Sequence, residues 1–224
     1  MDCILRPLIN EYKETFGRDL EKIAEFYSDI FHQTSVTKEA KAEIALIGSH
    51  QQYLNDVRAN HDAARTAISK LADAQLWNKG YTSFDDLYRD VYELISRIKG
   101  IGGLTVYDTS LRISYAMKSA EVKKVYLNTG ARLGAEILLG KKAVASVMDV
   151  SVFEPYTGDL SAIHIENFLC IYKKVLSYKG YRDDIPFPKH HTCCCFCRSN
   201  MLAYKIMVLH DMTAESKFYP NQNN

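Results

Sequence analysis

The strongest restriction on the fold of this chain is that no proline lies between Pro7 and Pro155. Proline breaks helices and interrupts the central strands of sheets, so a long stretch without it can be filled by uninterrupted helices. The same stretch is rich in Ala, Glu, Lys and Leu, which are strong helix formers, and it has few clusters of β-branched residues. We therefore predict an all-α fold, and 224 residues are enough for a substantial core.

Apolar residues recur at helical spacing in three segments, and this spacing predicts helices over residues 19–33, 83–98 and 161–176. Asp19 and Ser83 are suited to cap the first two helices. The composition between Thr37 and Ala74 also favours helix, with a break near Gly48. We expect these segments to form one helical domain over residues 1–182, followed by a C-terminal appendage over residues 183–224 that ends in a short helix around residues 201–209.

The cellular setting follows from what the sequence lacks. No apolar run approaches the ~18–20 residues that cross a bilayer, so we expect a cytoplasmic protein without a membrane partner. The appendage is Cys-rich, but its spacing does not supply the two ligand pairs of a structural zinc site. We therefore expect no metal and no cofactor, although the segment holds these candidate ligands: His190, His191, Cys193, Cys194, Cys195 and Cys197.

Positive charge is concentrated in the middle of the chain. Residues 97–142 carry 9 Lys and Arg against 3 Asp and Glu, whereas residues 1–96 carry 11 against 16. A local positive field of this kind suits a surface that binds phosphates. An ordinary solvated surface is the alternative interpretation.

The basic segment begins with a predicted helical hairpin, in which Gly100 and Gly102 form a tight turn between two amphipathic helices over residues 97–117. Glycines permit positive φ and a close approach, so the N–H groups of the turn and of the next helix can converge on a phosphate. Ile101 and Leu104 are expected to anchor the turn inward. A purely structural helical hairpin would show the same pattern.

This stretch resembles the helix-hairpin-helix element of DNA repair proteins, and the wider resemblance is to the helix-hairpin-helix DNA glycosylase superfamily. Members are all-helical enzymes that flip a base out of duplex DNA and cut its N-glycosidic bond. The resemblance implies a double-stranded DNA partner, and some such enzymes act on modified bases of invading phage. Leu104 stands where members that also cleave the strand carry a lysine, so no lyase activity is implied. The residues that would hold the DNA backbone are Lys99, Gly100, Gly102, Gly103 and Thr105.

The catalytic aspartate of that superfamily follows the hairpin by about twenty residues, and the matching position here is Asn128. An amide cannot act as a carboxylate, although it can position a water or read a base edge. Asp108 is the preferred catalytic candidate because Arg112, four residues later, shares its helical face and can orient it. Glu166 is a second candidate. A surface ion pair is the alternative interpretation of Asp108 and Arg112.

Further DNA contacts are expected from basic and aromatic residues after the hairpin. The basic candidates for phosphate contacts are Arg112, Lys123, Lys124 and Arg132. Tyr107 or Tyr126 could stack on a flipped base, and a buried tyrosine is the alternative for each. Two other functions remain open at this point: a non-catalytic DNA-binding module of the same fold, and a helical protein–protein adaptor.

Overall fold

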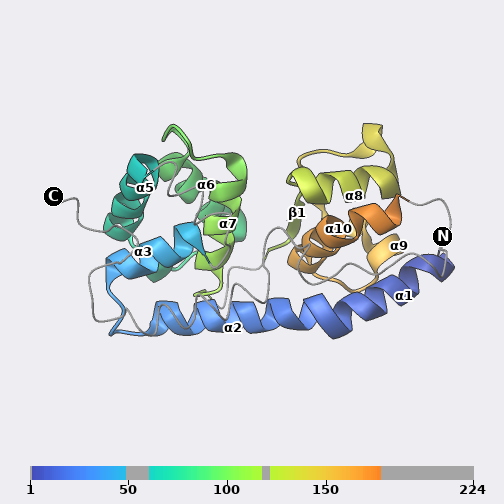
Figure 1. Ribbon diagram of the computed structural model, residues 1–224, viewed down its shortest axis with the longest axis horizontal. Coiled ribbons are helices and arrows are strands. Elements are labelled where there is room, and N and C mark those ends of the chain that lie inside the picture. The colour runs from blue at the N-terminus through green and yellow to red at the C-terminus, as the bar shows by residue number, and fades with distance from the viewer. Residues whose placement is uncertain (1, 49–60, 118–121, 178–224) are drawn as a thin grey trace.

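The computed structural model describes residues 2–48, 61–117 and 122–177. They form two helical lobes joined by a helical rod that runs along one side of the molecule (Figure 1). The predicted all-α class is confirmed, apart from one small sheet. In this part of the chain no helix is long and apolar enough to cross a membrane. The appendage predicted over residues 183–224, with its Cys-rich segment and short helix, lies outside the described residues.

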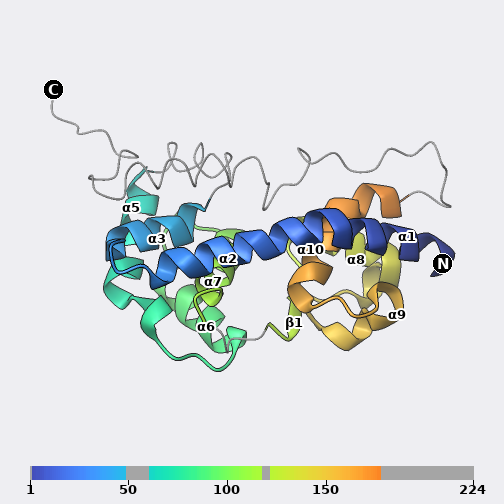
Figure 2. The same cartoon turned by 90° about the horizontal axis from the view of Figure 1, so that it is seen from below.

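The rod consists of α1 (Asp2–Tyr12), a π-helical turn η1 (Lys13–Gly17) and α2 (Arg18–His32). Tyr12 and Gly17 both keep right-handed helical dihedrals, so the rod is continuous across both junctions. The helix predicted over residues 19–33 is present, but the prediction that Asp19 caps it is wrong. Asp19 lies buried inside the rod because helix already precedes it. Figure 2 shows the rod crossing in front of both lobes, with α2 over the first lobe and α1 over the second.

In the described part of the chain, the first lobe packs four helices and a short 3₁₀ turn against the part of α2 from Ile23 to Phe31. Thr37 and Ser83 cap two of the helices by accepting hydrogen bonds from Ala40 and Asp86 N–H groups. Gly48 ends α3 with a φ of 62°, which confirms the predicted break. The elements are α3 (Lys38–Ile47), α5 (His61–Ala74), η2 (Leu76–Asn78), α6 (Phe84–Ile95) and α7 (Gly103–Ser114).

The second lobe is built around two helices, α8 (Thr129–Leu139) and α10 (Ala162–Leu176). They pack so closely that a Cβ on Gly134 would lie 2.4 Å from the Leu169 carbonyl oxygen. The predicted helix over residues 161–176 is α10, with Ser161 at its N-cap. The antiparallel pair β1–β2, in which Val125 faces Met148, was not predicted. The elements are β1 (Lys124–Tyr126), α8 (Thr129–Leu139), η3 (Lys141–Ala143), β2 (Val147–Asp149), η4 (Val150–Val152), α9 (Glu154–Thr157) and α10 (Ala162–Leu176).

Each lobe has its own hydrophobic core, and a third, smaller cluster lies between them. α1 and η1 contribute Leu8, Tyr12 and Phe16 to the core of the second lobe. The part of α2 from Ile23 to Phe31 contributes to the core of the first lobe, so the rod belongs to both. The buried residues of the third cluster come from α6, α7 and β1, and they are Phe84, Tyr107, Leu111 and Tyr126.

Candidate nucleic-acid interface

The hairpin predicted by the sequence is present as α6 and α7, joined by a turn over residues 96–102. Gly100 has a φ of 101°, a conformation that side chains disfavour, and Gly102 is the extended N-cap residue of α7. The N–H groups of residues 103–105 therefore have no capping side chain and no partner within the helix. A Cβ on Gly102 or Gly103 would meet no atom within 4 Å, so this backbone leaves room for a phosphate.

One of the two apolar residues predicted to anchor the turn does so. Ile101 packs against the core of the first lobe. The prediction for Leu104 is wrong, because its side chain is 40% exposed. The buried face of α7 begins only at Val106, while Thr105 is half-buried in the first turn. The open side of the hairpin thus combines N–H groups with an exposed leucine.

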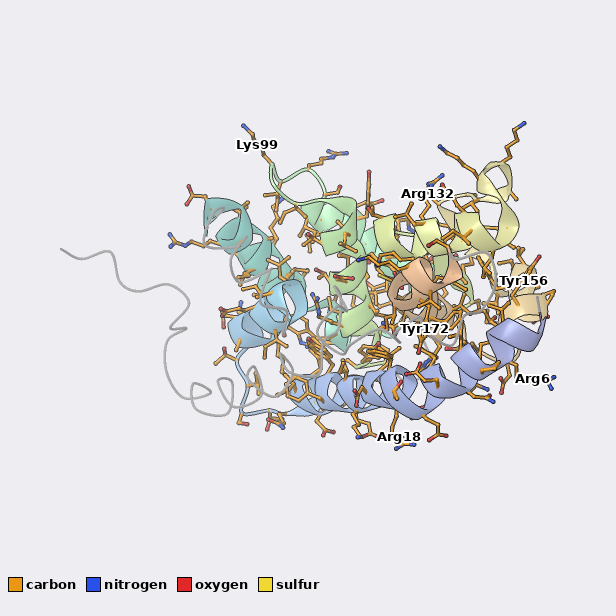
Figure 3. All side chains as sticks on the ribbon, turned by 45° about the vertical axis from the view of Figure 1, so that its right-hand side comes forward. Arg6, Arg18, Lys99, Arg132, Tyr156 and Tyr172 are labelled. Carbon is orange, nitrogen blue, oxygen red and sulfur yellow. The ribbon has the colours of Figure 1, made fainter. Side chains whose placement is uncertain are left out.

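Basic side chains from both lobes lie on one side of the molecule. Figure 3 shows Lys99 of the hairpin turn and Arg132 of α8 on the side opposite to Arg6 and Arg18 of the rod. Lys99 is exposed. The Arg132 guanidinium pairs with Glu136, with an Nε–Oε1 distance of 3.2 Å, while 42% of its side chain remains exposed. We call this side, carrying the turn and α8, the basic face.

The hairpin turn and the segment of α8 and η3 carry three further basic residues, which were not predicted from the sequence. Arg97 lies in the hairpin turn, and Lys141 and Lys142 lie in η3, which follows α8 directly. All three are exposed. The signal that could have found them was the excess of positive charge over residues 97–142, which does not by itself say which side chains share a surface.

Lys124 is engaged within the protein rather than on the basic face. It forms an ion pair with Asp85 of α6, and the Tyr126 hydroxyl donates to Asp85 Oδ1 at 2.6 Å. Burial tends to raise the pKa of Asp85, but hydrogen bonds from Lys124 and Tyr126 hold it below its usual value. Lys123 is exposed and lines a cavity at the end of α7 remote from the hairpin turn. DNA contacts by these two lysines stay predictions.

The two candidate base-stacking tyrosines lie against each other. The rings of Tyr107 and Tyr126 stack with centroids 5.4 Å apart, and Phe84 meets both rings edge-on. Both tyrosines are buried, with 2% and 8% of their surface exposed. In this conformation they therefore fill the contact between the lobes, and stacking on a base stays a prediction.

Asp108 and Arg112 form an ion pair deep in the first lobe, not at the surface. Arg112 Nη2 lies 3.7 Å from Asp108 Oδ2, and each side chain is almost fully buried. Arg112 Nη1 also donates to the carbonyl oxygens of Ala45 and Leu46, at 2.9 and 3.1 Å. These carbonyls belong to the last turn of α3, which lacks helical donors of its own. The guanidinium therefore caps α3 while it neutralises Asp108.

Glu166, the second carboxylate candidate, is buried in α10. It and Asp108 lie within electrostatic reach of the same phenol, Tyr115 at the end of α7. Burial and nearby Tyr27 raise the pKa of Tyr115, while Arg112 partly opposes the shift. The two candidate carboxylates, from separate lobes, are thus both buried and both act on the same phenol.

Asn128 lies at a more accessible position. It is the N-cap residue of α8, two residues after Tyr126 of the interlobe contact, and it is half-buried. Its side chain makes no capping hydrogen bond, and Nδ2 is buried without a partner among the described residues. In Figure 1 this end of α8 faces the first lobe. A buried amide nitrogen without a partner is costly, so we expect an ordered water to be its partner.

The described residues hold no group of three or more His, Cys, Asp or Glu side chains placed to bind a metal ion. The segment from His190 to Cys197 lies outside those ranges.

Comparison with known proteins gives no match. No protein family fits the sequence, and no curated protein or solved structure is significantly similar to it. The function of the basic face has to be inferred from its own geometry and charge.

Proposed function

We propose that this chain is a monofunctional DNA glycosylase-like enzyme that binds duplex DNA on the basic face and removes a modified or damaged base. The observation that carries the proposal is the position of Lys99 and Arg132, which come from separate lobes and lie on one side (Figure 3). Phosphates repeat along a duplex, so one duplex can contact basic side chains of both lobes. The resemblance to helix-hairpin-helix glycosylases supports the same function.

The chemistry proposed for this site is hydrolysis at the sugar. A water oxygen forms the new bond to C1′, and the base leaves with a proton as the glycosidic bond breaks. Asn128 can hold the water, because its Nδ2 is buried and has no partner among the described residues. Leu104 offers no amine for a covalent sugar intermediate, so the expected product is an abasic site in an intact strand. Hypermodified phage bases are among the candidate substrates.

The first test measures DNA affinity. We expect the double change Arg97→Ala and Lys99→Ala to weaken binding of a labelled duplex about tenfold at low salt, because each side chain neutralises a phosphate. The plot of log affinity against log salt should become shallower by about 2. Fluorescence anisotropy over a salt series measures both quantities.

The matched control for this test is the double change Arg6→Ala and Arg18→Ala. It removes the same charge from the opposite side of the molecule, where both arginines are exposed. We expect the control to change affinity less than about twofold. An equal loss of affinity in both double variants would mean that only net charge matters, and it would refute the basic face.

The second test measures base excision. Purified protein is incubated with undamaged, damaged and hypermodified phage DNA, and abasic sites are detected by alkaline strand cleavage. We expect abasic sites on one substrate class, and a rate about a hundredfold lower for Asn128→Ala, a loss typical of removing one positioned donor. Asn78→Ala, an exposed amide in the first lobe, is the control. Unchanged excision in Asn128→Ala would remove this residue from the mechanism.

A non-catalytic DNA-binding module is the second candidate function, and one observation favours it. Asp108 and Glu166 are only 1% and 6% exposed, so neither carboxylate reaches a bound nucleotide in this conformation. Salt-sensitive binding without abasic sites on any substrate would establish this alternative. Absence of DNA binding at low salt would leave the protein–protein adaptor.

A further inference from the structure

The two lobes meet at a contact that, among the described residues, buries fewer side chains than either core. Tyr126 of β1 is the buried ring that the second lobe contributes to this contact. Its centroid lies 5.2 Å from that of Phe84, 5.0 Å from that of Tyr88 and 5.4 Å from that of Tyr107. These three rings belong to α6 and α7. One ring of the second lobe thus lies among three rings of the first.

Polar contacts of the same strand accompany this ring contact. Asp85, in the first turn of α6, forms an ion pair with Lys124, and its Oδ1 accepts the hydrogen bond of the Tyr126 hydroxyl. Lys124 and Tyr126 are two residues apart on β1, so they share one face of the strand. The side chains of Lys124 and Asp85 remain 50% and 43% exposed. An exposed ion pair contributes little free energy, so these contacts can break while both cores stay folded.

The rod also connects the two lobes, and it has a place where it can bend. Its first part, through Phe16, belongs to the core of the second lobe, and α2 joins the core of the first lobe from Ile23 onward. Between them, at Gly17 and Arg18, the backbone changes from the π-helical turn η1 to the regular α-helix of α2. Long helices bend at interruptions of this kind. A bend there would move one lobe relative to the other and leave each core intact.

We propose that Asp85, Lys124 and Tyr126 form a latch between the lobes, and that its opening, with the rod bending near η1, uncovers the rings of Tyr107 and Tyr126. Both rings are buried in the closed form that the structure shows. Opening exposes apolar ring surface to water, so the closed form is the resting state and the open form is a minor population. The latch itself needs no nucleic acid. Stacking of a base on the uncovered rings rests on the proposed function.

The test is hydroxyl-radical footprinting of the full chain without DNA, in which mass spectrometry measures the oxidation rate of each tyrosine ring. The Asp85→Lys variant replaces the attraction to Lys124 by repulsion. We expect the oxidation rates of Tyr107 and Tyr126 to rise about fivefold, because losing an exposed ion pair shifts an equilibrium by up to about that factor and the reversal adds repulsion. Unchanged oxidation rates for both rings would overturn the latch.

Two controls separate opening of the latch from unfolding of a lobe. Tyr27 and Tyr172 are buried in the cores of the first and second lobes, and their oxidation rates should change less than about twofold. Asp86→Lys makes the same charge change at the next residue, whose ion pair with Arg89 stays within α6. It should leave the Tyr126 ring protected. An increase as large as that for Asp85→Lys would overturn the assignment to the latch.

A milder variant decides the question if Asp85→Lys does not fold. Asp85→Asn keeps the size of the side chain and removes its charge, and we expect the oxidation rate of Tyr126 to rise about twofold. Failure of the latch and failure of the proposed function are told apart because the footprint is measured without DNA. An unchanged footprint overturns the latch whether or not the chain binds DNA. A footprint that responds in a chain without DNA affinity supports the latch and refutes the basic face.

Discussion

Replacing Arg112 by leucine should lower the free energy of unfolding by about 3–5 kcal/mol, the range found when one partner of a buried ion pair is removed. The change leaves the Asp108 carboxylate buried without its cation, and it leaves the Ala45 and Leu46 carbonyl oxygens without their donor. Urea unfolding followed by circular dichroism measures the loss. The midpoint should fall without a change of slope if the native state keeps its compactness.

The double change Arg112→Leu and Asp108→Leu should recover part of that loss, because neither charge of the pair is then left buried without the other. Stabilities that simply add across the two single variants would show that the two side chains are not coupled. Arg89→Leu is the matched control. Arg89 pairs with Asp86 at 2.7 Å on the surface of α6, and breaking an exposed pair should cost less than about 1 kcal/mol.

Gly134→Ala should destabilise the protein by about 2–3 kcal/mol, at the upper end of what an overpacked site costs. The new Cβ would lie 2.4 Å from the Leu169 carbonyl oxygen, which is backbone and cannot rotate away. α8 would have to move away from α10, and the apolar side chains of the two helices would lose contacts with each other. Thermal and urea unfolding measure the effect.

Gly103→Ala is the matched control for this change, because it adds the same methyl group to a helical glycine with no atom within 4 Å. Alanine is the better helix former, so this variant should be unchanged or more stable by up to about 1 kcal/mol. The two substitutions should therefore have opposite or clearly different effects. A loss for Gly103→Ala as large as that for Gly134→Ala would contradict the close packing of α8 on α10.

Local signals account for the elements that the sequence predicts well. The helices α6 and α10 have apolar stripes with Ser83 and Ser161 at their N-caps, and these patterns act over a few residues. Asp19 has the right chemistry for a cap, but the chain before it is already helical. A capping residue indicates a helix start only where the preceding segment is not helix, which a single window of sequence does not reveal.

The candidate site depends more on contacts between distant residues. Arg112 meets carbonyl oxygens 66 and 67 residues away, and Tyr126 meets a carboxylate 41 residues away. The spacing of apolar residues in α7 does not show whether the Asp108–Arg112 pair is exposed or buried. The pair is buried because α3 packs over it. The turn at Gly100 and Gly102, with Lys99 beside it, was predictable from local spacing. Whether Lys99 and Arg132 share a surface depends on how the two lobes are joined.

The path of the rod has a consequence for the order in which the protein folds. The core of the second lobe combines Leu5–Phe16 with residues beyond Val122, and the hydrogen-bonded partners Tyr12 and His164 are 152 residues apart. The helices of the first lobe lie between these two segments in the chain. That lobe can be completed while the ribosome is still making the rest, whereas α1 keeps its apolar side uncovered until α10 emerges. We therefore expect the first lobe to form early and the second to close late.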